Sequence, residues 1–266
     1  MITERPITIR DLSRDFAVLG VKEGMTVLLH SSLKSIGGWI VGGAEAVILA
    51  LEEVLGKEGT LVMPTQSPNL TNPETWGNPP ADPKWWQLIR DSMPPYDPDA
   101  TVTSGMGVIP ETFRKQKGVI RSLHPHVSFA ARGRAARELM EPHPLTDGLG
   151  ESSPLARLYA ADAFVLMLGT GHGSNTSFHL AEYRAPWRGK EHITSQAPVS
   201  RAGGKTEWVS FSDINYHSDD FEALGAAFEQ AYKEDCSFGN VGAASCVLVK
   251  QRRMVDFAVD WLARNR

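Results

Sequence analysis

The sequence is poor in cysteine, in runs of like charge and in long apolar stretches. Its two cysteines, Cys236 and Cys246, form no CxxC pair and no Cys/His cluster. A disulfide framework and a thiolate zinc site are therefore not expected, and a reducing cytoplasm is the expected location. No apolar run approaches the roughly 18–20 residues that a membrane span requires. The charged first sixteen residues are not expected to act as a signal peptide.

The chain also lacks the charge pattern of a protein that binds a polyanion. The formal net charge is −4, and no run of Lys and Arg exceeds two residues. Neither nucleic acid nor a membrane is therefore an expected partner. A mild acidic excess instead suits a cationic small molecule.

Apolar strands that alternate with amphipathic helices predict an α/β fold. The apolar run 25–32 is followed by a periodic helix at 44–56 and by a second apolar run at 59–67. Strand, helix and strand in this order form a βαβ unit with parallel strands. We find no repeat and no linker. We therefore predict one α/β domain over residues 1–266, with a mixed, largely parallel central sheet flanked by helices.

Residues 64–103 form a long irregular segment inside this pattern. The segment is rich in proline and contains Trp76, Trp85 and Trp86. A loop of this length in a compact domain is usually functional, and its aromatic content argues against plain disorder. We interpret it as an insertion that forms a lid or one wall of a binding site.

Three predicted strands end in polar or glycine-containing loops, at 30–32, at 65–67 and at 168–176. In open α/β sheets, ligands bind beyond the carboxyl ends of the strands. The three ends are therefore expected to meet at one pocket. The alternative for any single loop is an ordinary turn.

His179 and Glu182 follow the third of these loops on a short predicted helix. Positions three apart share one helix face. A glutamate beside a histidine fixes the ring's tautomer and raises its basicity, so the pair could serve as a general base. The plain alternative is an ion pair, or a core histidine that a local carboxylate satisfies.

Several familiar site patterns are missing. The glycines at 37–43 precede a helix and could favour an anion, but they match neither GxGxxG nor Walker A, and no GxSxG elbow is present. His124 and His126 have no HExxH context and no nearby carboxylate, which argues against a metal site. Arg121 is the residue here that is best suited to a phosphate.

Five stretches together resemble the aminoglycoside 3-N-acetyltransferases, a family of antibiotic acetyltransferases with the YokD-like fold. They are VLLHSSLKSIGGWIVGGAEAVILAL, GTLVMPTQS, RSLHPHVSFAARG, GESSPLARLY and MLGTGHGSNTSFHLAEY. They occur in the family's order over nearly the whole chain. The chain departs from the family at HPHVSF, where many members have HPTHSF, so Val127 stands before the serine.

The resemblance implies acetyl transfer from acetyl-CoA to the 3-amino group of the 2-deoxystreptamine ring of an aminoglycoside, with antibiotic resistance as the outcome. It implies that His179 and Glu182 are catalytic, that no metal takes part, and that a homodimer is an open possibility. The residues expected to bind coenzyme A are His30, Ser31, Ser32, Leu33, Lys34, Ile36, Gly37, Gly42, Gly43, Met106, Arg121, Ser128 and Phe129. The residues expected to bind the aminoglycoside are Asp213, Asp219, Asp220, Glu222, Thr65, Gln66 and Asn175.

Three other functions stay open at the level of sequence. One is acetylation of a different small amine. Another is a metal-dependent hydrolase that uses His124, His126 and His179. The last is a non-catalytic protein that binds coenzyme A.

Overall fold

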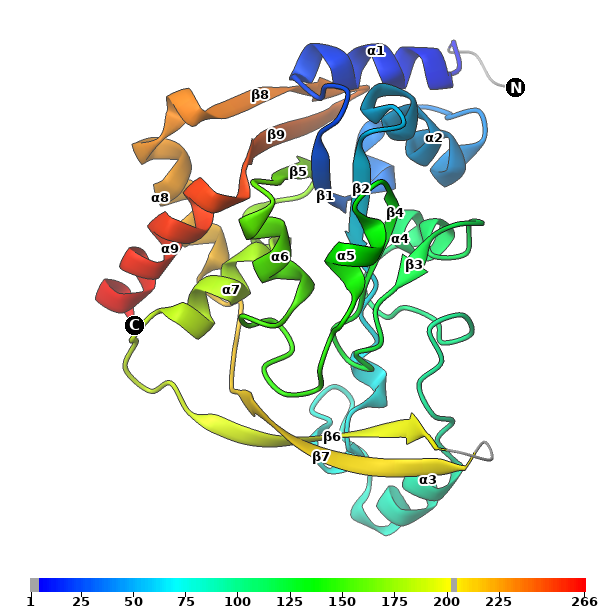
Figure 1. The fold of residues 1–266 in the computed structure, drawn as a ribbon, viewed down its shortest axis with the longest axis vertical. Helices are drawn as coiled ribbons and strands as arrows, with labels where there is room; N and C mark the ends of the chain where they lie inside the picture. The colour runs from blue at the N-terminus through cyan, green and yellow to red at the C-terminus, as the bar shows by residue number, and fades with distance from the viewer. Residues whose placement is uncertain (1–4, 202–204) are drawn as a thin grey trace.

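The computed structural model describes residues 5–201 and 205–266, and its centre is a mixed β-sheet (Figure 1). In this described part the sheet has seven strands, in the order β3-β4-β2-β1-β5-β9-β8. Their bounds are β1 (Thr26–Ser31), β2 (Thr60–Pro64), β3 (Ile120–Arg121), β4 (Phe129–Gly133), β5 (Phe164–Leu168), β8 (Cys236–Val241) and β9 (Ala244–Lys250).

The direction of the strands follows from their pairing. β1 pairs in parallel with β2 and with β5, and the four other neighbouring pairs of the described sheet are antiparallel. β4 and β9 run antiparallel to the three central strands, and β3 and β8 run antiparallel to β4 and β9. Five of these seven strands therefore run in the same direction. The α/β fold with a mixed sheet is confirmed, and its parallel pairing is confined to the centre.

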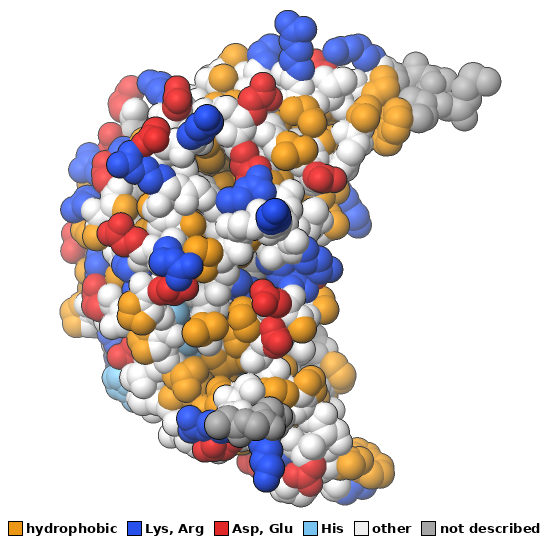
Figure 2. Space-filling model, turned by 45° about the vertical axis from the view of Figure 1, so that its right-hand side comes forward, with side chains coloured by type: hydrophobic (Ala, Val, Ile, Leu, Met, Phe, Trp, Pro, Cys, Tyr) orange, Lys and Arg blue, Asp and Glu red, His pale blue; other side chains and the backbone are white. Residues whose placement is uncertain are grey.

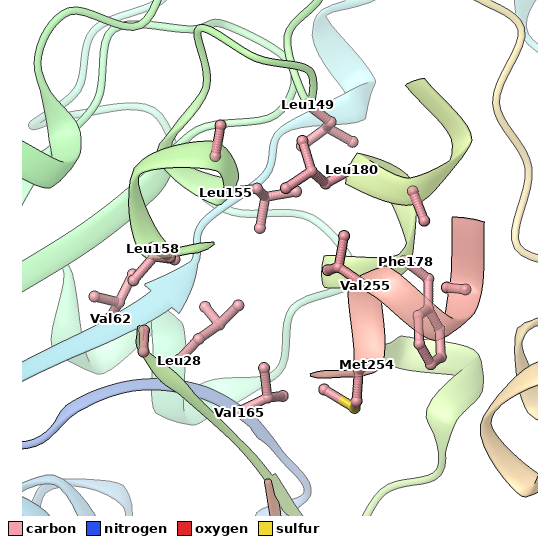
Figure 3. Close-up of a cluster of buried hydrophobic side chains, with 14 of the residues drawn as sticks. Leu28, Val62, Leu149, Leu155, Leu158, Val165, Phe178, Leu180, Met254 and Val255 are labelled. Carbon is pink, nitrogen blue, oxygen red and sulfur yellow. The ribbon is translucent and has the colours of Figure 1, made fainter. Parts of the chain in front are cut away.

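Helices cover both faces of the sheet. One face carries α1 (Ile9–Leu19), α2 (Gly43–Leu55) and α4 (Val108–Phe113). The other carries α5 (Ala136–Met140), α6 (Pro154–Ala160), α7 (Ser177–Arg184), α8 (Phe221–Ala231) and α9 (Gln251–Asn265). Side chains of a strand alternate between the faces, so Val27 and Leu29 pack under α1 and α2, whereas Leu28 packs under α6. Figure 3 shows this second cluster, which includes Val165 of β5, Phe178 of α7 and Met254 of α9.

The sequence specifies the first helix through its ends. The Thr8 side chain accepts a hydrogen bond from the Asp11 amide, and the Asp11 carboxylate accepts one from the Thr8 amide. This is a capping box, and it satisfies two amides at the start of the helix. Gly20 ends the helix with φ of 114°, which glycine adopts without strain.

The proline- and tryptophan-rich segment folds into short helices, which are η2 (Pro68–Leu70), η3 (Pro73–Thr75), η4 (Pro83–Trp85) and α3 (Trp86–Ser92). It packs against a separate hairpin, β6 (His192–Ser200) and β7 (Thr206–Ile214), which lies with α3 at the bottom of Figure 1. Asn72 Nδ2 donates to Gln196 Oε1 over 2.7 Å, and Trp208 Nε1 donates to the Arg90 carbonyl over 3.0 Å.

In the turned view of Figure 2 the molecule has a crescent outline. The interpretation as one domain with an insertion at about 64–103 stays a prediction. A search for membrane-spanning helices within residues 5–201 and 205–266 finds none of sufficient length and apolarity.

Candidate active site

The carboxyl ends of the three parallel strands meet at one pocket. Ser31 at the end of β1 stands beside Leu168 at the end of β5, and the other neighbour of β1 is β2. The pocket has a volume of about 290 Å³. It is lined by Leu29, His30, Ser31, Pro64, Gln66, Gly105, Met106, Pro110, Thr170, Gly173, Ser174, Asn175, Thr176, His179, Ser218 and Phe221. The convergence predicted from the three loops is therefore observed.

The helix α7 brings His179 to this pocket. Asn175 Oδ1 accepts a hydrogen bond from the Ser177 amide at the start of the helix, at 3.1 Å. Phe178 and Leu180 are fully buried in the core and fix the rotation of α7. His179 lies between these two positions and therefore faces away from that core, towards the pocket.

His179 and Glu182 form a hydrogen-bonded pair. The distance from His179 Nδ1 to Glu182 Oε2 is 2.5 Å, and the Glu182 side chain has no exposed surface. In the neutral ring Nδ1–H donates to the carboxylate, so Nε2 keeps a lone pair. Tyr216 and Phe221 hold the ring from its sides, with ring centroids 4.9 and 4.8 Å away. The ring is therefore held in one orientation at the pocket, with Glu182 on Nδ1.

A third charged residue completes this arrangement, and the sequence analysis missed it. Arg266 Nη1 lies 2.5 Å from Glu182 Oε1, and its other nitrogens contact both oxygens of Asp220. The His217 amide donates to the same Glu182 oxygen over 3.0 Å. No spacing rule links residues 84 positions apart, so the sequence offered no signal for this contact.

His30 and Ser31 form the β1 wall of the pocket. Burial lowers the pKa of His30 to about 3, so its ring is neutral at physiological pH. Its Nε2 lies 3.4 Å from Thr176 Oγ1. Ser31 Oγ is buried and has no hydrogen-bond partner among the described residues. A buried hydroxyl without a partner is costly, so this oxygen is available to a ligand.

Arg121, which the sequence analysis assigned to a phosphate, is built into the fold instead. Its side chain donates to Ser128 Oγ and to the main-chain carbonyls of Thr65, Pro98 and Thr101. The guanidinium also lies over the Tyr96 ring, at 5.2 Å from its centroid. It thereby ties the long segment 64–103 to the sheet. All three of its side-chain nitrogens donate within the fold, which gives Arg121 a structural role and not a contact with a phosphate.

Several other residues expected at the donor site lie in the core. Ile36, Ser128 and Phe129 have no exposed surface, and Thr65, expected at the acceptor site, is equally buried. Thr65 and Ser128 bond to each other through main chain and side chain. These four residues are buried in the fold and are absent from the pocket lining, which assigns them structural roles. Leu33, Lys34 and Gly37 belong to the turn after β1, with Ser32 before it, while Gly42 and Gly43 start α2.

The acidic residues predicted to bind the acceptor do not form one cluster. Asp213 is buried and accepts hydrogen bonds from the Tyr183 hydroxyl and the Ile214 amide, and burial raises its pKa. Asp220 pairs with Arg266. Both therefore serve the fold. Asp219 is exposed and follows Ser218 of the pocket lining, and Glu222 accepts from the Gly173 amide at the pocket rim.

Two of the three histidines of the hydrolase alternative, His124 and His126, are bonded to the main chain. His124 Nδ1 accepts from the amides of residues 126 and 127, and His126 Nε2 lies 3.3 Å from the Leu70 carbonyl. Burial lowers the pKa of His126 to about 4. The described ranges contain no group of three His, Cys, Asp or Glu side chains placed to hold a metal ion.

Fold and site together define an α/β protein whose pocket, at the carboxyl ends of parallel strands, holds a hydrogen-bonded His–Glu pair. The comparisons agree with this class, and the chain belongs to the aminoglycoside 3-N-acetyltransferase family, whose model matches residues 28–263. The family, the fold and the acetyltransferase class predicted from the sequence are thereby confirmed.

Individual relatives cover nearly the whole chain. The aminoglycoside N(3')-acetyltransferase-like protein YokD of Bacillus subtilis is 45% identical over 264 residues, which are 99% of this chain and 95% of YokD. Aminoglycoside N(3)-acetyltransferase IX of Micromonospora chalcea is 35% identical, over 97% of this chain and 94% of the relative. The crystal structure of YokD superimposes with a TM-score of 0.94, and covers 99% of this chain and 96% of that one. A binary complex of AAC-IIIb with CoASH, 29% identical, has a TM-score of 0.86 over 97% of each chain.

Proposed function

We propose that this protein transfers the acetyl group of acetyl-CoA to the 3-amino group of the 2-deoxystreptamine ring of an aminoglycoside, and so confers resistance, with His179 as the base. The observation that carries the proposal is the orientation of His179. Its Nδ1 is held by Glu182, and the ring lines the pocket. Only Nε2 remains to take a proton from a bound acceptor.

The chemistry requires such a base. An aminoglycoside amine is protonated at neutral pH and must lose a proton before its nitrogen can attack the thioester carbon. His179 Nε2 accepts a proton from the attacking nitrogen, directly or through a water, while the new C–N bond forms. The C–S bond then breaks, and the coenzyme A thiolate takes up a proton. Glu182 holds the ring in place and stabilises the imidazolium.

Ser31 is proposed to stabilise the negative charge that develops on the thioester oxygen. Its buried hydroxyl lines the pocket with no partner in the described chain, and a pre-positioned donor is most effective in a site that excludes water. We expect Ser31→Ala to lower kcat by about tenfold, the equivalent of one hydrogen bond of roughly 1.4 kcal/mol, at an almost unchanged melting temperature. Steady-state kinetics with both substrates measures this.

A mutation elsewhere on the pocket rim provides the control for Ser31. Thr170 lines the same pocket from the loop after β5, and its hydroxyl is already paired with Ser174 Oγ over 3.0 Å. Thr170→Val should therefore leave kcat within about twofold of the parent value. Equal losses in the two variants would mean that the polarity of the rim, and not Ser31 itself, supports the reaction.

The donor is proposed to enter along the β1 wall. The relative AAC-IIIb has been solved with CoASH, which supports coenzyme A as the product here. Ser32 and the turn at 33–37 continue this wall from the pocket. The start of α2 at Gly42 and Gly43 has no side-chain cap, so its amides are suited to a phosphate group. His30, Met106 and Gln66 also line the pocket.

The acceptor is proposed to bind beside Asp219 and Glu222. Relatives with lower identity have been solved with sisomicin and with a gentamicin, which supports a polycationic acceptor. Because exposed charges are screened by salt, we expect the KM for an aminoglycoside to rise several-fold between low and high ionic strength. Asp219→Asn should raise KM at low salt and flatten its salt dependence.

Glu234→Gln is the matched control for this prediction. It removes the same charge at the exposed opposite end of α8, in η6 (Lys233–Asp235). This variant should keep the KM and the salt slope of the parent. If Asp219→Asn behaves in the same way, Asp219 has no part in binding the acceptor.

The choice of acceptor is tested by release of coenzyme A with a panel of amines. The proposal predicts turnover with aminoglycosides that contain 2-deoxystreptamine, and little with unrelated amines. Turnover confined to another amine would favour the alternative acetyltransferase. Release of no coenzyme A would favour a binding protein, and activity that follows metal content would favour the hydrolase. A cytoplasmic location, which the two free cysteines suit, and a homodimer stay predictions.

A further inference from the structure

The carboxylate of Glu182 is shared between two cationic partners. Its Oε2 faces His179 Nδ1, and its Oε1 faces Arg266 Nη1, both at 2.5 Å. The side chain of Glu182 is completely buried, and that of Arg266 is 6% exposed. Arg266 therefore contacts the carboxylate from the side opposite to the proposed base.

A buried carboxylate needs this compensation. An ionised carboxylate without a full counter-charge is costly away from water, and it lowers that cost by binding a proton. Arg266 remains charged here, because its bonds to Asp220 and Glu182 outweigh the effect of burial and raise its pKa. Trp187 and Phe221 pack against the guanidinium and hold it in place, at 5.0 and 6.0 Å from its centre.

We propose that Arg266 is a positioning residue of the active site, which fixes Glu182 against His179 and keeps the His179–Glu182 pair free of an extra proton at neutral pH. The inference rests on the proposed function of His179. The two residues of the pair share a short hydrogen bond, so they take up that proton as a unit. Arg266 acts on this unit through Glu182 and does not touch the pocket.

Other titratable groups also face the pair, and each has a different effect. They are Tyr216, His217 and Asp220 from the segment between β7 and α8, Lys190 after α7, and His30 of β1. Tyr216 and His30 are neutral at pH 7, because burial raises the first pKa and lowers the second. Lys190 is bonded to the carbonyls of Tyr183 and Ala185. Asp220 reaches the pair only through Arg266.

The sign of the effect follows from the charges. A cation beside Glu182 opposes the binding of a proton to the pair. Its removal therefore raises the pKa of the pair, and the base is lost at a higher pH. We expect Arg266→Met to move the acid limb of the kcat/KM profile up by about one pH unit, the lower end of the range for a lost opposite charge. At a pH well below both acid limbs this corresponds to about a tenfold loss relative to the parent.

Two further variants separate charge from geometry. Arg266→Lys keeps the charge but loses the planar fork that reaches both carboxylates. It should restore the acid limb to within a few tenths of a pH unit while kcat stays several-fold low. Asp220→Asn breaks the other half of the Arg266 network and leaves the contact with Glu182. It should lower the melting temperature, and the acid limb should lie at or below the pH found for the parent.

The ring of His179 offers a readout that does not depend on turnover. Titration of its imidazole by NMR in the parent and in Arg266→Met should show the same upward shift as kinetics. Loss of melting temperature in Arg266→Met with an unchanged His179 titration would overturn the inference and leave Arg266 a purely structural residue. If Arg266→Met does not fold, a kcat in Arg266→Lys equal to that of the parent would overturn the inference. A parent without turnover would count against the proposed function, while the titration would still decide the role of Arg266.

Discussion

Replacement of His179 by alanine should lower kcat by about 100-fold or more, the usual scale for a lost general base. The protein should stay folded, because the His179 side chain is partly exposed and sits at the pocket, not in the core. The affinity for acetyl-CoA should change little. Steady-state kinetics, with circular dichroism and a binding measurement for acetyl-CoA, checks all three expectations.

Two further variants provide the comparison for His179→Ala. His192→Ala removes an exposed histidine from β6 and should keep the parent's kcat. Glu182→Gln should cost less than the loss of His179, because the amide can still accept a hydrogen bond from the ring. A folded His179→Ala protein with nearly normal turnover would remove this residue from the mechanism.

Replacement of Arg121 by alanine should produce the largest loss of stability. The change leaves the carbonyls of Thr65, Pro98 and Thr101 without their cationic donor inside the protein. The Thr65 carbonyl keeps its hydrogen bond from Ser128 Oγ, whereas the part-buried carbonyls of Pro98 and Thr101 lose their donor. Unpaired groups cost about 1–3 kcal/mol each, so the total should reach about 2 kcal/mol or more. Because each kcal/mol moves the melting temperature of a domain near this size by roughly 2–4 °C, thermal unfolding should show a drop of about 4 °C or more.

The control for Arg121 is an arginine on the surface. Arg137 pairs with Glu141 on α5, and its side chain is 74% exposed, so Arg137→Ala should shift the melting temperature by a degree or two at most. The KM for acetyl-CoA should be unchanged in folded Arg121→Ala at low temperature. A stable Arg121→Ala protein with a raised KM for the donor would return Arg121 to the phosphate site.

Much of the fold could be predicted because local signals specify it. Thr8 and Gly20 delimit α1, and the apolar strands β1, β2 and β5 are buried along most of their length, as expected for the centre of a parallel sheet. Three strands were missed. β3 has only two residues, Ile120 and Arg121. β6 contains Pro198 and polar residues, and β8 contains Gly239 and Asn240. Their pairing with β7 and β9 forms these strands, and pairing is not visible in a single segment.

The site was predicted where its residues are close in sequence. His179 and Glu182 are three residues apart, and the loops that meet them follow recognisable strands. Residue type alone was misleading for Arg121, because a guanidinium suits a buried set of carbonyls as well as a phosphate. Arg266 could not be found at all, since its partner is 84 positions away and only the packing of α9 against α7 brings the two together.

The central claim is that this pocket acetylates an amine with His179 as the base. The most direct measurement follows coenzyme A release from acetyl-CoA with a 2-deoxystreptamine aminoglycoside, for the parent and His179→Ala side by side, and locates the new acetyl group by NMR. We expect one coenzyme A per acetylated product, the acetyl group on the 3-amino nitrogen, and a rate at least about 100-fold lower without His179. Acetylation at the same rate in both proteins, or no acetylated product from the parent, would contradict the account.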